Sequence, residues 1–289
     1  MNPSENRPTG IDESMPGCAA LQRPEMSEYF SGRRLWGDDF SRDEIEAWFR
    51  DEADAYFKLE AKDRSSYEYD YHKLNRLHGY RFLPDGRLGN ALCFGGAYGE
   101  EIRPIAARCD RITIVDPGAY TTEAIDGTPV EFRQPDASGK IPASDSEFDL
   151  VTCLGALHHV PNVGTVLREI GRCLRPGGHA LIREPIVSMG DWRKPRSGLT
   201  ARERGIPYPI LLELIQRGGM APKRVARCVF PLTPRIGRSL GVSWFNSPTL
   251  TRLDALLSKA CVWPTVYHPI RPYQRIQPSA AFVVAKKIV

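Results

Sequence analysis

Short apolar segments alternate with helix-length connections along the middle of this chain, and this alternation constrains its fold more than any other feature. The segments suited to buried strands are Leu88–Phe94, Arg111–Val115, Val130–Gln134, Phe148–Cys153 and His179–Arg183. Strands separated by helical connections form βαβ units, in which the strands are parallel and helices cover both faces of the sheet. The pattern therefore predicts an α/β fold with a doubly wound, mainly parallel sheet.

Two later segments, Arg224–Phe230 and Ala280–Lys286, extend the expected sheet to seven strands. Ahead of the sheet, Ser41 and Glu44 have the spacing of a capping box, and apolar residues at helical spacing follow over Arg42–Leu59. We therefore expect a helical N-terminal extension in front of the α/β domain.

The chain divides into parts of different composition. Residues 1–30 are polar and lack periodicity, so we expect them to be disordered. Residues 31–84 form the helical extension, which can fold over the site as a lid or pack on the sheet. Residues 85–289 form the main domain, with a candidate substrate loop at 184–208 and a basic C-terminal segment.

The cysteines and the apolar runs bear on the cellular environment. Seven cysteines, at positions 18, 93, 109, 153, 173, 228 and 261, contain no C-x-x-C pair, which is typical of reduced thiols and predicts no metal site. No apolar run approaches the roughly 20 residues of a membrane-spanning helix, and the N-terminus lacks the apolar core of a signal peptide. We expect a cytoplasmic protein without a membrane span.

Charge is distributed unevenly along the chain. Residues 1–60 carry 7 Lys and Arg against 14 Asp and Glu, whereas residues 183–289 carry 18 against 5, a net charge of +13. A basic C-terminal third favours an anionic partner, such as a phosphate-bearing substrate, a nucleic acid or an acidic membrane surface. The alternative is that this third docks on the acidic N-terminal part.

A glycine-rich turn, Gly95-Gly96-Ala97-Tyr98-Gly99, follows the first expected strand. Such a turn brings backbone close to a ligand and places the N–H groups of a helix beside it. The dinucleotide fingerprint G-x-G-x-x-G is not met, which argues against a nicotinamide oxidoreductase. Taken alone, the glycines are also consistent with a tight turn that binds nothing.

Motifs in a fixed order carry a resemblance to a known family. The turn is followed by Ile114-Val115-Asp116, Gln134-Pro135-Asp136-Ala137, the segment from Phe148 to Val160, and Leu174-Arg175-Pro176-Gly177-Gly178. Together they resemble the motifs of class I (Rossmann-like) methyltransferases that use S-adenosylmethionine (SAM), mostly those acting on small molecules. The sequence departs from the first motif, (D/E)-x-G-x-G-x-G, because Cys93 replaces the usual acid and Ala97 the middle glycine.

The resemblance implies that SAM is the cofactor and that particular residues bind it. The residues implied are Gly95, Gly96, Ala97 and Gly99 in the turn, Asp116 on the ribose hydroxyls, Asp136 and Ala137 at the adenine, and Leu154. A carboxylate suits the ribose because it accepts hydrogen bonds from both hydroxyls. The alternatives are that Asp116 caps a strand end, that Asp136 forms a turn, and that Leu154 belongs to the core.

Three side chains are candidates for catalysis. His158 and His159 follow the fourth strand, where the family places residues that face the methyl donor, and Glu184 follows the fifth. An imidazole can remove a proton from an acceptor hydroxyl because its ordinary pKa, about 6.5, is near working pH. A His-His pair at this place also occurs in the family with unrelated substrates, which favours a positioning role instead.

The candidate substrate residues lie in two segments. The loop after the fifth strand carries Trp192 as a stacking platform and Arg193, Lys194 and Arg196 as possible anion binders, although it also reads as a solvated basic loop. Tyr71 and His72 lie in the helical extension. Ligands of open parallel sheets bind beyond the carboxyl ends of the strands, where the loop is expected.

The function expected from these features is SAM-dependent O-methylation of a small-molecule or sugar-type acceptor, which can bear a phosphate. The flanking segments resemble sugar-modifying members associated with glycan biosynthesis. One alternative is an RNA or other nucleic-acid methyltransferase, disfavoured because the chain lacks a recognisable nucleic-acid module. Another is a SAM-binding module without activity, suggested by Cys93 and Ala97. The sequence does not indicate an oligomeric state.

Overall fold

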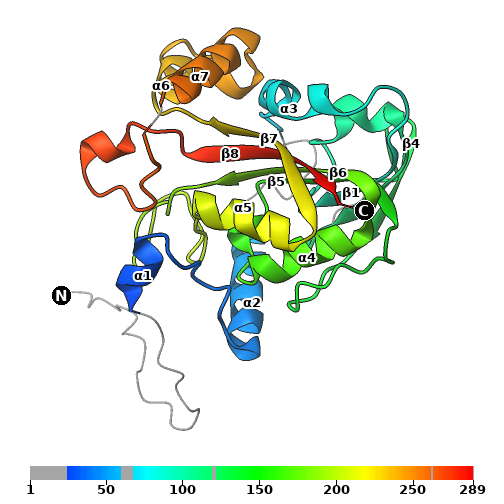
Figure 1. Ribbon diagram of the computed structural model, residues 1–289, viewed down its shortest axis with the longest axis horizontal. Helices are drawn as coiled ribbons and strands as arrows, with labels where there is room; N and C mark the ends of the chain where they lie inside the picture. Colours follow the sequence, from blue (N-terminus) through cyan, green and yellow to red (C-terminus); the bar gives the residue numbers. More distant parts are fainter. Residues whose placement is uncertain (1–24, 60–67, 119–121, 262, 289) are drawn as a thin grey trace, which may run out of the picture.

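The computed structural model describes residues 25–59, 68–118, 122–261 and 263–288, and these residues build one sheet with helices on both faces (Figure 1). The sheet has the strand order β3-β4-β2-β1-β5-β6-β8-β7. Its strands are β1 Gly89–Phe94, β2 Cys109–Val115, β3 Ala124–Ile125, β4 Thr128–Arg133, β5 Phe148–Leu154, β6 Leu174–Pro185, β7 Met220–Cys228 and β8 Ala280–Lys287.

The strands from β4 to β6 are parallel, and the three remaining pairings are antiparallel. β1 pairs with β2 and β5, β2 with β4, and β5 with β6, all in parallel. β8 runs antiparallel to both β6 and β7, and β3 runs antiparallel to β4. Each expected strand segment overlaps an observed strand, but the expected count of seven is wrong. The additional strand, β3, is two residues long, too short for a periodicity to reveal it.

Helices cover both faces of the sheet. The α-helices are α1 Met26–Phe30, α2 Arg42–Leu59, α3 His72–His78, α4 Val163–Cys173, α5 Tyr208–Arg217, α6 Leu232–Ser239 and α7 Pro248–Ala260. The short 3-10 helices are η2 Tyr80–Phe82, η3 Arg103–Arg108, η4 Leu157–His159, η5 Trp244–Asn246 and η6 Pro272–Arg275. In Figure 1, α4 and α5 lie on one side of the sheet and α6 and α7 on the other.

The alternation of side chains along each strand gives the protein two cores. On β8, Ala281 and Val283 belong to the core under α4 and α5, whereas Phe282 and Val284 belong to the core under α3 and α7. Successive side chains of a strand point to opposite faces, so a strand buried on both sides is apolar throughout. This explains the continuous apolar runs in the sequence.

Of the two N-terminal helices, the sequence predicted α2 and did not predict α1. α2 begins and ends where the capping box and the spacing predicted, and the Ser41 N–H donates to the Glu44 carboxylate at 2.9 Å. For residues 26–30 alone, α1 contradicts the expectation of disorder, because Phe30 stacks on Trp192 with ring centroids 4.4 Å apart. Residues 1–24 lie outside the described residues.

Other local expectations were corrected. The helix whose N–H groups were expected beside the glycine turn is the 3-10 helix η3, which begins only at Arg103. Among the described residues, no helix is long and apolar enough to cross a membrane.

Trp48 attaches α2 to the rest of the protein. Its side chain is fully buried, and its indole Nε1–H donates to the backbone carbonyl of His159 at 2.8 Å. The N-terminal extension is therefore joined to the turn that follows β5 by both packing and a buried hydrogen bond.

We predict that Trp48→Ala lowers the free energy of unfolding by about 3–5 kcal/mol, because it empties a large buried volume. Trp48→Phe should cost about 1–3 kcal/mol, mainly for the carbonyl of His159 left without its donor. Denaturant unfolding measures both, and Leu256→Ala on the exposed side of α7 serves as a control with a change within about 0.5 kcal/mol. A loss for Trp48→Ala no larger than that of the control would contradict this anchoring role.

Candidate active site

Two adjoining cavities lie at the carboxyl ends of β1, β2 and β5. Gly95, Gly155 and His159 line both. The first cavity extends towards Asp116 and Asp136, and the second extends towards Tyr69, Tyr71 and the end of β6. The carboxyl ends of parallel strands are where open α/β sheets bind ligands, so these cavities form the candidate site.

Asp116, at the end of β2, places a carboxylate in the wall of the first cavity. It is only 4% exposed, and its two oxygens accept the backbone N–H groups of Ala97 at 3.0 Å and Gly118 at 2.9 Å. Burial raises the pKa of this carboxyl to about 6, although the two N–H donors act in the opposite direction. A buried acceptor group is thus aimed at a ligand space with otherwise mainly apolar walls.

The glycine turn is shaped by close packing as well as by its nearness to the cavity. A Cβ on Gly95 would lie 2.3 Å from the Cβ of Ala156, and one on Gly99 would lie 2.4 Å from Ile125 Cδ1. Both have positive φ, and so does Ala97, at +44°, where the family motif has its middle glycine. Ala97 therefore keeps the turn at the cost of backbone strain, and it donates the N–H that binds Asp116.

The other predicted cofactor residues are divided between the two cavities. Asp136 and Ala137 line the first, with one oxygen of the exposed Asp136 held by the backbone N–H of Ser138 at 2.8 Å. Leu154 and Gly96 line the second. Ala97 and Gly99 line neither of these two cavities.

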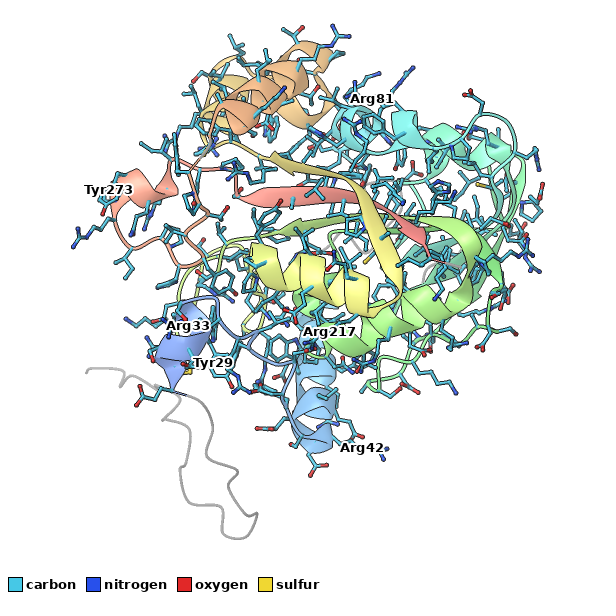
Figure 2. The ribbon with its side chains drawn as sticks, in the orientation of Figure 1. Tyr29, Arg33, Arg42, Arg81, Arg217 and Tyr273 are labelled. Carbon is cyan, nitrogen blue, oxygen red and sulfur yellow. The ribbon has the colours of Figure 1, made fainter. Side chains whose placement is uncertain are left out.

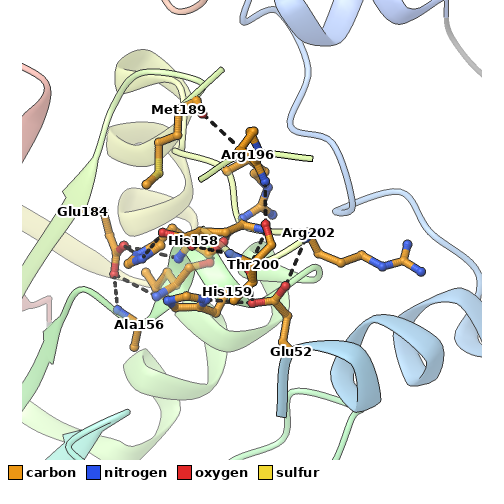
Figure 3. Close-up of polar contacts among 12 residues, drawn as sticks. Glu52, Ala156, His158, His159, Glu184, Met189, Arg196, Thr200 and Arg202 are labelled. Carbon is orange, nitrogen blue, oxygen red and sulfur yellow. Dashed lines mark hydrogen bonds and ion pairs between the residues drawn. The ribbon is translucent and has the colours of Figure 1, made fainter. Parts of the chain in front are cut away.

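Glu184 is fully buried and shapes the turn after β5. Its carboxylate accepts the backbone N–H groups of Ala156 at 2.9 Å, Leu157 at 2.8 Å and His158 at 3.2 Å (Figure 3). It also contacts His158 Nδ1 at 2.8 Å. A carboxylate with these partners orients the turn and its histidine, which differs from the proton-removing role expected for it.

His158 lies between two carboxylates. Its Nδ1 faces Glu184, and its Nε2 lies 3.5 Å from Glu203. Burial alone would lower the pKa of His158, but the hydrogen bonds to Glu184 and Glu203 raise it to about 9. Near neutral pH His158 is therefore an imidazolium, which already carries the proton that a general base must take up.

His159 has a different partner, supplied by the N-terminal extension. Its Nδ1 lies 2.8 Å from the carboxylate of Glu52, a buried residue of α2. Glu52 also accepts the Thr200 hydroxyl at 2.7 Å and the Arg202 N–H at 3.1 Å (Figure 3). Glu52 was missed by the sequence analysis, since only the docking of α2 brings it to a residue 107 positions away.

One cluster among the described residues has the ligand atoms of a cation site. Atoms of His158, His159 and Glu203 all lie within 4.8 Å of one another. A proton shared between His158 and Glu203 is an alternative to a cation at the same place. Treatment with a chelator distinguishes the two.

The loop after β6 does not bring its predicted residues to the cavities. Trp192 is 5% exposed and stacks between Phe30 and Trp36, while Arg193 pairs with Asp191 at 2.8 Å. Arg196 donates to backbone carbonyls, including that of Thr200 at 2.9 Å. In the described part of the chain, these residues and Lys194 line neither cavity, whereas Met189 of the same loop lines the second.

The segment before α3 contributes aromatic side chains to the second cavity. Tyr69 and Tyr71 line it, and the Arg183 guanidinium lies 3.9 Å from the centre of the Tyr71 ring. His72 packs against Tyr69 with ring centroids 5.0 Å apart and is outside the cavity lining of the described residues.

The charge on His158 can be measured directly. We predict that its ring proton resonances titrate near pH 9 in an NMR experiment, and that Glu203→Gln lowers this pKa by removing one carboxylate. Because the folded pKa exceeds the unfolded value of about 6.5, this ion pair stabilises the fold fully below pH 6.5 and is lost as pH rises through about 9. A His158 pKa at or below 6.5 would contradict the ion pair.

Comparisons with known proteins concern the middle of the chain. Residues 92–182 match the family model described as a methyltransferase domain. A ubiquinone biosynthesis O-methyltransferase of Pseudomonas putida (strain GB-1) is 29% identical over 125 residues, covering 41% of this chain and 53% of that relative's own length.

Solved structures show the same fold at low identity. The [4+2]-cyclase SpnF is 18% identical, with a TM-score of 0.50 over 75% of this chain and 81% of that one. A putative methyltransferase in complex with the Haloferax volcanii Trm112 activator is 15% identical, with a TM-score of 0.50 over 86% of this chain and all of the other. Since one of them is a cyclase, the fold alone does not establish methyl transfer. The family match over residues 92–182 therefore identifies a methyltransferase domain in this part of the chain, on the sheet described above.

Proposed function

We propose that the protein transfers a methyl group from SAM to a hydroxyl group of a small, neutral, ring-containing acceptor. The observation that carries the proposal is His159, which lines both cavities and is oriented by the buried Glu52. A residue at the junction of a donor cavity and an acceptor cavity is the one placed to act on the reacting atoms.

The first cavity suits the adenosine part of SAM. Asp116 can accept hydrogen bonds from both ribose hydroxyls, and Val115, Ala156, Val160 and Val166 provide apolar surface for the adenine. With the adenosine there, the methionine part would extend past Gly95 into the second cavity. SAM supplies a methyl group on a sulfonium, which is reactive without further activation.

His159 is the candidate general base. With its Nδ1 facing Glu52, the imidazole would take the hydroxyl proton at Nε2 while the acceptor oxygen forms its bond to the methyl carbon and the carbon–sulfur bond breaks. The products are the methyl ether, S-adenosylhomocysteine (SAH) and an imidazolium stabilised by Glu52. His158 and Glu184 hold the turn on which His159 lies, and are positioning residues.

The second cavity favours a neutral acceptor over the anionic one first considered. Its charged lining is mainly acidic, with Glu68, Asp70, Glu101, Glu184 and Glu203 against two cations, Arg183 and the His158 imidazolium. Carboxylates accept hydrogen bonds from hydroxyl groups, but repel a phosphate.

Aromatic side chains in the same cavity favour a ring. Tyr69, Tyr71 and Phe245 line it, and the Tyr71 and Phe245 rings lie 4.1 Å apart. Such surfaces pack against the apolar faces of a sugar or a phenolic ring. A sugar-type acceptor, and with it a role in glycan modification, is therefore consistent with the cavity, and the O-methyltransferase relative supports transfer to oxygen.

The basic residues of the C-terminal third do not form a cluster at this site. Arg217 pairs with Glu213 and Arg227 donates to the Trp263 carbonyl, while Arg202 pairs with Asp51 of α2. In Figure 2, Arg217 lies by α5, on a different part of the molecule from Arg81 of η2, a basic residue that precedes this third. This scattering does not favour the nucleic-acid alternative, which needs a continuous basic surface.

The cofactor assignment leads to a binding prediction. Asp116→Asn should weaken SAH binding at least tenfold by isothermal titration, because the amide is a poorer acceptor for two hydroxyls. Asp110→Asn, an exposed residue near the start of the same strand, is the matched control and should leave the affinity unchanged. Equal SAH affinity in both variants would remove Asp116 from the ribose site.

The catalytic assignment leads to an activity prediction. With methyl-labelled SAM and a panel of sugars, phenols and RNA, label should enter a hydroxylated small molecule and not RNA. His159→Gln should lower kcat about a hundredfold or more, with Glu52→Gln intermediate and SAH affinity retained in both. Full activity in His159→Gln would exclude the base, and loss of activity on chelation would assign the His158–His159–Glu203 cluster to a metal ion instead.

A further inference from the structure

The acid that the family carries at the end of the first strand is absent from this chain. Cys93 stands there, fully buried, and burial raises the pKa of its thiol well above the ordinary value. This position therefore supplies no negative charge to the cavity.

A carboxylate lies beside it, from a residue farther along the chain. Glu101 follows the glycine turn, and its side chain points back to β5, where the Thr152 hydroxyl donates to it at 2.5 Å. It is 4% exposed and lines the second cavity together with Gly95 and Gly96. Interactions with both Cys93 and Thr152 place its carboxylate at the ends of β1 and β5.

Glu101 has no cation as a direct partner, although the charge of Arg183 acts on it. Within the described parts of the chain, no ion pair joins it to a basic side chain. The nearby cation, Arg183 on β6, directs its guanidinium to Asn75 Oδ1 at 2.8 Å and to the Leu154 carbonyl at 2.9 Å.

The other ionisable groups around Glu101 cannot balance its charge. They are Tyr69 before α3, Tyr80 of η2, Cys93 of β1, Asp116 after β2, Cys153 of β5 and Glu184 of β6. None of these is a cation. Burial raises the pKa of Glu101 to about 7, and buried carboxylates are normally paired with a cation. A cationic group of a ligand would complete this site.

We propose that Glu101 binds the α-ammonium group of SAM and takes the place of the acid missing at Cys93. The inference rests on the proposed function, in which the adenosine lies against Asp116. From there the amino-acid end passes Gly95 and Gly96 and enters the second cavity beside Glu101. In this chain the carboxylate is thus supplied from the turn after β1 instead of from the strand itself, and Cys93 leaves room for it.

The test compares SAH with 5′-methylthioadenosine, which shares the adenosine and the sulfur but has no amino-acid group. Glu101→Gln should weaken SAH binding at least tenfold by isothermal titration and leave methylthioadenosine affinity within twofold. Glu100→Gln, the neighbouring residue paired with Arg103, is the matched control and should change neither. Asp116→Asn should weaken both ligands alike, which separates the two ends of the cofactor.

A second measurement needs no variant, and therefore holds even where Glu101→Gln is too unstable to assay. In the wild-type protein, the ratio of SAH affinity to methylthioadenosine affinity should fall as pH drops from 8 to 6, because Glu101 loses its charge near pH 7. The titration of Asp116 affects the binding of both ligands, since both contain the ribose. Its effect therefore cancels in the ratio of the two affinities.

The role of Glu101 would be overturned if Glu101→Gln weakened the binding of both ligands equally or of neither. It would also be overturned if the ratio of the two affinities did not depend on pH. Absence of binding of both ligands by the wild-type protein would instead overturn the proposed function on which it rests.

Discussion

One buried carboxylate sets the geometry on which the site depends. Glu184, at the end of β6, accepts three successive backbone N–H groups of the turn after β5 and holds Nδ1 of His158. Such N–H groups would otherwise be buried without partners, at about 1–3 kcal/mol each. These hydrogen bonds hold the turn, and with it the backbone of both histidines, in place.

The carbonyl side of the same turn is held from the opposite direction. Arg204 is fully buried and donates to the carbonyls of Val160 at 2.9 Å and Pro161 at 3.2 Å, while Trp48 donates to that of His159. Because Trp48 and Glu52 both belong to α2, the N-terminal helix fixes the backbone of His159 and orients its ring. The extension thus supplies residues to the candidate site, beyond the covering role of a lid.

The sequence predicted what depends on local patterns and on ordered motifs. Strand positions follow from buried apolar runs, α2 from spacing and capping, and Asp116 from its place among the family's ordered motifs. Glu52 and Glu101 were not predicted, since their roles arise from the packing of segments distant in sequence. Trp192 shows the opposite error: topology indicated a substrate platform, but Phe30 and Trp36 cover its ring.

The central claim is that one cofactor bridges the two cavities, with its reactive sulfur at His159. A crystal structure of the SAH complex tests this most directly. The account predicts both ribose hydroxyls on the Asp116 carboxylate, the sulfur at the junction formed by Gly95, Gly155 and His159, and the ammonium group beside Glu101. SAH bound with its ribose away from Asp116, or with its sulfur remote from His159, would contradict it.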